Sequence, residues 1–340
     1  MIDFKIHTEL KSVYKEMDRS VFHYSFDTSF SNILARQDHS EFCMVSFKGD
    51  ISGYFPVLIR NSKLITTLKF LFVPVSADGE YLSGDQEQIV LEGFVEFLKK
   101  DGKVDRILQP LNWVLFQACP SNSISAPFGT YRLELSDEET IWKGLHSKHR
   151  NVIRNAQKKE VRILEGMDQL DTFYSLYKQT MERSDMFFEP KGFFEELAKT
   201  YQKNVVCAVA YSGDEPQGAL FVPYTTQRAD YVYGASAGRV SLTGAINALH
   251  YQVILELMKK GVRQYDFVGA RLSDVKGTKL EGIQKFKQRF GGELVKGYLW
   301  KMDINAGKCR MYDMALKTKL GIKGKRIGKD IIDQERLKLG

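Results

Sequence analysis

The sequence predicts an α+β fold with mixed, mainly antiparallel sheets, flanking helices and two domains. A chain of 340 residues is long for a single hydrophobic core, because most domains hold about 100 to 200 residues. Short runs rich in β-branched and aromatic residues follow one another with turn signals between them, as in antiparallel meanders. One strand–helix–strand unit, over residues 229–268, has the length of a crossover that makes two strands parallel.

The first domain is predicted over residues 1–138. Its strands are expected at residues 42–47, 54–59, 64–70, 104–108 and 130–135. Apolar residues at helical spacing predict a helix over residues 86–100. A loop rich in Pro, Ser, Asn and Gly, residues 112–129, precedes the last strand, and the boundary is expected just after that strand.

The second domain is predicted over residues 139–302. Ser136 and Glu139 have the spacing of a capping box and predict one helix from there to residue 158. Further helices are expected near residues 167–181, 190–201, 243–260 and 280–290. Strands are expected at residues 161–164, 205–211, 217–224, 229–235, 264–268 and 294–302. Residues 303–340 lack a strand signal and predict a helical, basic segment that could pack back on the first domain.

Positive charge is concentrated in the second part of the chain. Residues 1–138 hold 14 basic and 19 acidic residues, a net charge of −5, whereas residues 139–340 hold 35 and 23, a net charge of +12. A surplus of this size favours a polyanionic partner such as RNA, a diphosphate or an anionic membrane surface, although solubility alone explains part of it. DNA is not expected as a partner, and contact with a membrane would be peripheral, through the basic C-terminal segment.

Several classes of protein are excluded by missing motifs. The chain has no HExxH, GxSxG, GxxxxGK[ST] or GxGxxG sequence, which argues against hydrolases and nucleotide triphosphatases. Its six His and four Cys lack metal-ligand spacing, so no metal is expected. The apolar runs are too short to span a bilayer, and the first residues do not resemble a signal peptide. A cytoplasmic location is therefore expected.

The order of elements after residue 160 resembles the core of the GNAT acyltransferases. This resemblance implies that the acyl donor lies where two parallel strands splay apart, between residues 231–236 and 264–268, and that the first domain is a second, degenerate copy of the core. In GNAT enzymes that use coenzyme A, the turn before the crossover helix normally reads [RQ]xxGx[GA] and binds a pyrophosphate. Residues 238–244 read GRVSLTG instead, so the donor need not be a coenzyme A thioester.

Three segments together resemble the FemABX family, which transfers amino acids from aminoacyl-tRNA to an amine of a peptidoglycan precursor. Residues 142–161, WKGLHSKHRNVIRNAQKKEV, are similar to the family's W..L..K.R..IRKA.K.GV helix. YVYGAS at residues 231–236 and GVRQYDFVG at residues 261–269 are similar to YxYGAS and GxxxYDFGG, with Val268 in place of a glycine. GIQKFKQRFGG at residues 282–292 is similar to GIxxFKxxFGG. No heptad run predicts the coiled-coil arm that many members carry.

The resemblance implies roles for several residues. Lys287 would stabilise the oxyanion or the leaving ribose hydroxyl, with Phe286 anchoring it, and Asp266 would orient the attacking amine or accept its proton. Arg183, in a segment similar to TxxRxxF, would bind the diphosphate of the precursor. Each role has a plainer alternative: an exposed lysine for Lys287, a carboxylate capping the next turn for Asp266, and a surface ion pair for Arg183.

The spacing of residues along the chain predicts two further groups of candidate substrate-binding residues. Arg150, Arg154 and Lys158 recur every four residues and form a cationic stripe, which suits phosphates but is also typical of a solvated helix face. Tyr231 and Tyr233 are expected on one face of a strand, where they would stack on substrate or pack in the core.

The predicted function is aminoacyl or acyl transfer to a primary amine of a cell-envelope precursor, with no tightly bound cofactor and aminoacyl-tRNA favoured over acyl-CoA as co-substrate. Two alternatives remain. The protein would be an acyl-CoA-dependent N-acyltransferase of an amino sugar or amino acid, as in the BioF-like and CelD-like relatives, or a non-catalytic RNA- or envelope-binding protein on the same scaffold.

Overall fold

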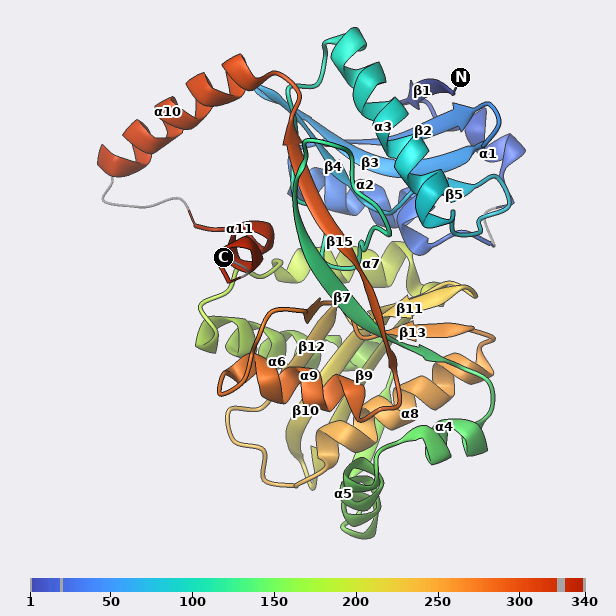
Figure 1. Ribbon diagram of the computed structural model, residues 1–340. Helices are drawn as coiled ribbons and strands as arrows, with labels where there is room; N and C mark the ends of the chain where they lie inside the picture. Colours follow the sequence, from blue (N-terminus) through green and yellow to red (C-terminus); the bar gives the residue numbers. More distant parts are fainter. Residues whose placement is uncertain (1, 19–20, 323–327, 339–340) are drawn as a thin grey trace. The chain divides into compact units, whose positions relative to one another are not determined.

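The computed structural model describes residues 2–18, 21–322 and 328–338 (Figure 1). The chain divides into two compact units: unit 1 holds residues 1–129, 270–274 and 296–340, and unit 2 holds residues 130–269 and 275–295. The division differs from the predicted domains because strands β7 (Ile124–Glu134) and β15 (Glu293–Asp303) each supply residues to both units. The boundary therefore falls inside two strands instead of after them.

Unit 1 contains a mixed sheet whose strands are paired in the order β1-β2-β3-β4-β6-β15-β7. Besides β7 and β15, this sheet contains β1 (Asp3–His7), β2 (Glu41–Lys48), β3 (Gly53–Asn61), β4 (Thr66–Phe70) and β6 (Arg106–Ile107). Short β5 (Val75–Ser76) pairs with β3, and β14 (Ala270–Arg271) pairs with β7. Strands β1 to β4 pair with one another in antiparallel order, whereas β4 and β6 pair in parallel. The predicted meander over residues 42–70 is confirmed.

The helices of unit 1 pack around an aromatic core. They include α1 (Val13–Glu16), the 3-10 turn η2 (Tyr24–Phe26), α2 (Thr28–Gln37) and α3 (Gly84–Asp101). Ser83 and Gln86 form a capping box at the start of α3, which begins two residues before the predicted helix. Phe94 of α3 contacts Phe55 and Phe70 of the sheet, with ring centroids 4.9 and 6.1 Å apart. The apolar face of α3 is thus covered by the sheet, as its spacing predicts.

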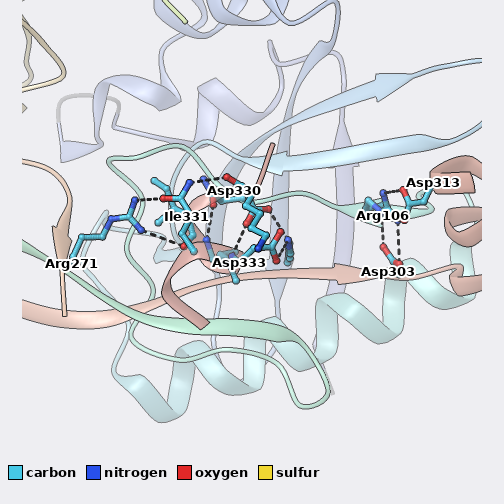
Figure 2. Close-up of polar contacts among 12 residues, drawn as sticks. Arg106, Arg271, Asp303, Asp313, Asp330, Ile331 and Asp333 are labelled. Atoms are coloured by element: carbon cyan, nitrogen blue, oxygen red, sulfur yellow. Dashed lines mark hydrogen bonds and ion pairs between the residues drawn. The ribbon is translucent and has the colours of Figure 1, made fainter. Parts of the chain in front are cut away.

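The C-terminal segment forms helices α10 (Ala306–Ile322) and α11 (Ile331–Arg336), both in unit 1. Figure 2 shows how Arg106 joins Asp303 and Asp313, with N–O distances of 2.6 and 2.8 Å. At α11, the buried carboxylate of Glu335 lies 2.9 Å from Arg271 and accepts a hydrogen bond from Ser273. Residues 323–327 of the predicted basic segment lie outside the described residues.

No helix in the part of the chain that the structure describes is both long and apolar enough to cross a membrane. The longest helix in that part is α3, with 18 residues.

Unit 2 contains a four-stranded antiparallel sheet in the order β12-β10-β9-β8. Its strands are β8 (Arg162–Glu165), β9 (Val205–Ser212), β10 (Glu215–Pro223) and β12 (Tyr233–Ser236). Phe221 of β10 packs on α6 (Leu170–Arg183) and α7 (Lys191–Thr200), whereas Gly218 lies against Ile246 of α8 (Ala245–Lys259). The two groups of helices therefore cover opposite faces of this sheet. The 3-10 turn η3 (Met167–Gln169) directly precedes α6, and the 3-10 turn η4 (Gln202–Asn204) follows α7.

The strand predicted over residues 229–235 is divided between two sheets. Its first part, β11 (Arg228–Asp230), pairs in parallel with β13 (Gln264–Asp266), which is antiparallel to β7. After Tyr231 and Val232 the chain leaves β13 and pairs with β10 as β12. The parallel crossover is confirmed, and the two strands splay apart directly after Asp230.

The prediction of a single helix over residues 136–158 is wrong. Two helices occur instead, α4 (Glu138–Gly144) and α5 (Ser147–Lys158), and Asp137, not Ser136, caps the first by accepting from the backbone N–H of Thr140. Leu145 is extended, with φ −60° and ψ 135°, and the next N–H donates to the carbonyl of Arg289. The segment that follows α9 (Lys279–Gln288) thus interrupts the helix through a tertiary contact that its own sequence does not reveal.

Candidate functional site

A buried carboxylate, Asp266, ends strand β13 at the point of the splay. Its oxygens accept hydrogen bonds from the hydroxyl of Thr130, from Nε of Arg132 at 2.8 Å and from the backbone N–H of Val268 at 2.8 Å. Nη1 of Arg228 lies 3.7 Å away. Because these groups occupy most of the acceptor positions of the carboxylate, Asp266 is better placed to hold the turn after β13 than to accept a proton.

Lys287 lies in α9 and its residue is 7% exposed. Its ammonium group donates hydrogen bonds to the backbone carbonyls of Val268 and Gly269, the latter at 2.7 Å. Burial lowers the pKa of Lys287 to about 8, although the charge of Asp266 opposes this effect. An ammonium has three N–H donors, and these two carbonyls occupy two of them.

The turn that Lys287 contacts has an unusual backbone. Val268 has φ +39° and Gly269 has φ +61°. A β-branched residue rarely adopts a positive φ, and such residues typically cost about 1 to 3 kcal/mol. Val268 thus keeps the conformation of the glycine that the resembling motif has at this position, while the ammonium of Lys287 and the carboxylate of Asp266 hold the turn from two sides.

Charged side chains form a buried cluster beside this turn. Arg228 lies 2.8 Å from Asp230 and shares Asp266 with Arg132. Together with Lys287 the cluster holds three cations and two carboxylates. Among these five side chains the positive charges outnumber the negative charges by one, and charges act strongly where water is excluded.

Aromatic rings pack on α8 beside the splay. The fully buried ring of His250 lies 4.5 Å from Tyr231, 5.1 Å from Phe286 and 5.5 Å from Phe290, measured between centroids. The hydroxyl of Tyr265 lies 3.5 Å from its Nδ1. Burial lowers the pKa of His250 to about 3, so this ring is neutral at pH 7. Phe286, predicted as an anchor, thus takes part in a packed cluster one residue before Lys287.

Tyr231 and Tyr233 do not share a face, which corrects the prediction from strand periodicity. Tyr231 packs on His250 of α8, and its ring lies so close to Gly234 that an ideal Cβ there would be 2.3 Å from the hydroxyl. Tyr233 packs on Phe194 of α7, with centroids 5.1 Å apart. The strand breaks between the two tyrosines, so a period of two does not apply, and Tyr233 is a core residue.

The turn before α8 is held by a buried glutamine side chain. Oε1 of Gln217 accepts hydrogen bonds from the backbone N–H groups of Ser241, at 2.7 Å, and Leu242, at 3.1 Å. Gly244, at the start of α8, has φ +92°, and an ideal Cβ there would be 2.1 Å from the carbonyl oxygen of Val152 in α5. The side chain of Gln217 thus occupies two backbone donors of the turn that would otherwise be available to a pyrophosphate.

Arg183 lies at the end of α6, at the edge of a cavity of about 680 Å³. Its Nη2 donates to the carbonyl of Ser236 at 2.7 Å and to the hydroxyl of Thr180 at 3.2 Å. An ideal Cβ on Gly238, which lines the cavity, would be 3.6 Å from Nη1 of Arg183. Arg239 also lines this cavity. The charged residues that line the cavity are thus Arg239 and Glu215, and Arg183 lies next to it, beside Gly238.

The three cations predicted as a stripe on α5 have different surroundings. Nη1 of Arg150 donates to the carbonyls of Lys143 and Leu145, so this side chain binds the end of α4. The guanidinium of the exposed Arg154 lies 5.1 Å from the ring centroid of Trp142. The side chain of Lys158 is exposed near the end of α5. Arg154 and Lys158 remain accessible to phosphates, whereas Arg150 has a structural contact.

Residues 146–287 match the family model described as an acetyltransferase (GNAT) domain. Among solved structures, the chain is similar to FemX, with a TM-score of 0.63 and 12% identity over 84% of this chain and 93% of that chain. The fold is a FemABX-like GNAT fold. A conserved protein of unknown function from Bacteroides thetaiotaomicron VPI-5482 is also similar, with a TM-score of 0.50 and 15% identity over 88% of this chain and 99% of that chain. No curated protein matches this chain.

A tandem GNAT protein from the clavulanic acid biosynthesis pathway is a more distant likeness, with a TM-score of 0.48 and 8% identity over 89% of this chain and 99% of that chain. The predicted α+β class with mixed, mainly antiparallel sheets is confirmed. The match to an acetyltransferase domain supports the predicted class of enzyme, an acyltransferase.

Sequence reasoning missed several residues of this region. Arg132 and Arg228 lie far apart in the sequence and meet only because β7 and β11 both flank β13. Gln217 and His250 carry no motif, since their roles depend on burial. A buried polar residue is recognisable in a sequence only where it interrupts an apolar pattern, and His250 does so within the apolar face of α8.

Proposed function

We propose that the protein transfers an aminoacyl or acyl group from an activated donor to a primary amine of a cell-envelope precursor, with aminoacyl-tRNA as the favoured donor. The occupied turn before α8 is the observation that carries this preference. In GNAT enzymes that use coenzyme A, backbone N–H groups of this turn bind the pyrophosphate, and here Gln217 already binds two of them, those of Ser241 and Leu242. An ester of a ribose hydroxyl needs no such turn.

The chemistry requires little beyond alignment and charge. The amine attacks the carbonyl carbon of the ester, a C–N bond forms, the C–O bond breaks, and the proton lost by the amine ends on the released hydroxyl. The third N–H of Lys287 and the surplus positive charge beside it suit the oxyanion that forms between these steps. Asp266 acts here as a positioning residue that fixes the turn at residues 268–269.

The acceptor would be bound through its anionic part. Arg183 uses one nitrogen for the carbonyl of Ser236 and keeps its other donors for phosphate oxygens, to which a guanidinium binds in a bidentate manner. The cavity next to Arg183 is lined by Arg239 and Glu215, and its volume suits a diphosphate-bearing small molecule.

The test is a transfer assay with purified full-length protein. It would be incubated with a uridine-diphosphate-linked, amine-bearing peptidoglycan precursor and either charged tRNA or acetyl-CoA, and products would be read by mass spectrometry. A mass increase from charged tRNA alone supports the proposal. An increase from acetyl-CoA alone would assign the acyl-CoA-dependent alternative, and binding of RNA or precursor without turnover of any donor would assign the non-catalytic one.

The role of Arg183 is tested in the same assay by Arg183→Gln. We expect the KM for the precursor to rise about tenfold, the loss of roughly one charge-assisted hydrogen bond, with kcat nearly unchanged. Lys178→Gln, an exposed lysine on the same helix, is the matched control. An unchanged KM in Arg183→Gln would remove the residue from precursor binding.

A further inference from the structure

Helix α10 packs on unit 1 through one of its faces. The buried Sγ of Cys309 donates to the carbonyl of Asp105 at 3.2 Å. Arg106 binds the carboxylate of Asp313 through two hydrogen bonds of 2.8 Å (Figure 2). Figure 1 shows α10 extending away from the end of β15. The side chains on the opposite face of this 17-residue helix are exposed, so that face is accessible to a partner.

The exposed face carries a narrow apolar stripe between two pairs of cations. Met311 and Met314 are neighbours on the helix surface and are 69% and 61% exposed. Helical spacing places two basic residues on each side of them: Arg310 and Lys317, two turns apart, on one side, and Lys308 and Lys319, three turns apart, on the other.

The exposed face has a surplus of positive charge. Arg310, Lys317 and Lys319 have no ion pair in the part of the chain that the structure describes, while Lys308 lies 3.2 Å from Asp105. Asp313, the acidic residue of α10, is bound by Arg106 on the packed face. The sequence after α10 adds three more basic residues: Lys323, Lys325 and Arg326. A negatively charged partner is therefore favoured over a neutral one.

The methionines distinguish between two kinds of negatively charged partner. An RNA would be bound by the cations, with aromatic side chains stacking on its bases, and both methionines would stay in water. At an anionic membrane surface, the apolar side chains of such a helix enter the boundary between headgroups and acyl chains, while long basic side chains reach the lipid phosphates. Only the membrane accounts for the stripe and the cations together.

We propose that the exposed face of α10 binds the surface of a membrane that contains anionic phospholipid. Met311 and Met314 enter the headgroup boundary, and the cations on both sides contact lipid phosphates. Because the apolar stripe is narrow, the binding is peripheral and reversible. The sequence alone indicates only a basic C-terminal segment, whereas the packing of α10 indicates which face meets the lipid. This inference does not rest on the proposed function.

The experiment measures co-sedimentation of the full-length protein with vesicles of phosphatidylcholine, alone or mixed equally with phosphatidylglycerol. We expect binding to the mixed vesicles only, and binding that weakens steeply as salt rises. Lys317→Gln combined with Lys319→Gln should weaken partitioning about 30-fold, since each cation near an anionic surface contributes about fivefold, or about 1 kcal/mol. The matched control is Lys99→Gln combined with Lys100→Gln, two exposed lysines of α3 whose loss changes the net charge equally.

Oxidation of methionine locates the contact. Hydrogen peroxide converts accessible methionine to its sulfoxide, which mass spectrometry of tryptic peptides detects. Met311 and Met314 should oxidise more slowly on the mixed vesicles than in solution, and Met186, which is 59% exposed in unit 2, is the internal reference. Met311→Gln combined with Met314→Gln removes apolar burial but no charge, so it should weaken partitioning about tenfold and leave the salt dependence unchanged.

Three results would overturn the inference: absent or equal binding to the two kinds of vesicle, unchanged partitioning of the double lysine variant, and protection of Met186 without protection of Met311 and Met314. Binding of a single-stranded RNA that the double lysine variant loses, without vesicle binding by wild type, would assign the face to nucleic acid and would also overturn it. None of these readouts depends on transfer activity, so the proposed function stands or falls separately.

Discussion

Replacing Lys287 by Met tests whether its charge acts on the transition state. Methionine is similar in length and apolar, so it suits a site that is 7% exposed. The change removes the ammonium that donates to Val268 and Gly269, and with it the one donor left for an oxyanion. Removal of one oxyanion donor typically costs about 2.7 to 4 kcal/mol in the barrier. We therefore expect kcat to fall about 100-fold or more, with little change in KM.

The pH dependence of the wild-type protein gives a second test of Lys287. Burial lowers its pKa from 10.5 to about 8, so the folded protein loses this proton near pH 8 while the unfolded chain keeps it until about 10.5. Where the unfolded state binds more protons, folding stability rises with pH. At about 1.36 kcal/mol per pH unit, the rise between these values amounts to about 3 kcal/mol.

Activity and stability should therefore change in opposite directions above pH 8. A neutral amine still has two N–H donors for Val268 and Gly269, so the turn remains held, but no charge is left for the oxyanion. The Lys287 contribution to the free energy of unfolding should increase up to about pH 10.5, while kcat falls as the ammonium loses its proton.

The assay combines single-turnover kinetics with urea unfolding at matched pH values, and Lys287→Met should lack both trends. Lys285→Met is the control, because Lys285 is on the same helix, is half exposed and pairs with Glu281. Catalysis by Lys287→Met within about threefold of wild type, less than about 0.7 kcal/mol, would refute the reasoning. Oxyanion stabilisation would then rest on Arg228 and Arg132.

Three other changes test the fold around the site. Gln217→Leu should lower the free energy of unfolding by about 2 to 3 kcal/mol in urea titrations, because two buried N–H groups lose their acceptor; a loss below about 0.5 kcal/mol would contradict this. Gly244→Ala should cost about 2 kcal/mol or more, since φ is +92° and the carbonyl of Val152 is too close, and an unchanged melting temperature would count against it. Glu335→Ala leaves Arg271 without its buried partner and should raise hydrogen exchange in α11 but not in α3; equal exchange would show that α11 is held by other contacts.

Local pattern predicted most elements of this fold but not their interruptions. Helix α3 and the strands of the meander follow from apolar periodicity, because one face of each is buried. The crossover over residues 229–268 followed from its length. The break at Leu145 and the change of sheet after Asp230 depend on partners distant in the sequence, the carbonyl of Arg289 and strand β10, which no local window contains.

The sequence predicted the roles of the site residues less well than it predicted the fold. Asp266 and Lys287 were named through a resemblance, and their contacts give them different tasks: Asp266 is surrounded by donors, while Lys287 has one donor to spare. Tyr233 was misplaced because period two fails where a strand breaks. Arg228 and Gln217 act through burial, a property that residue type alone does not predict for Arg and Gln, which are mostly exposed.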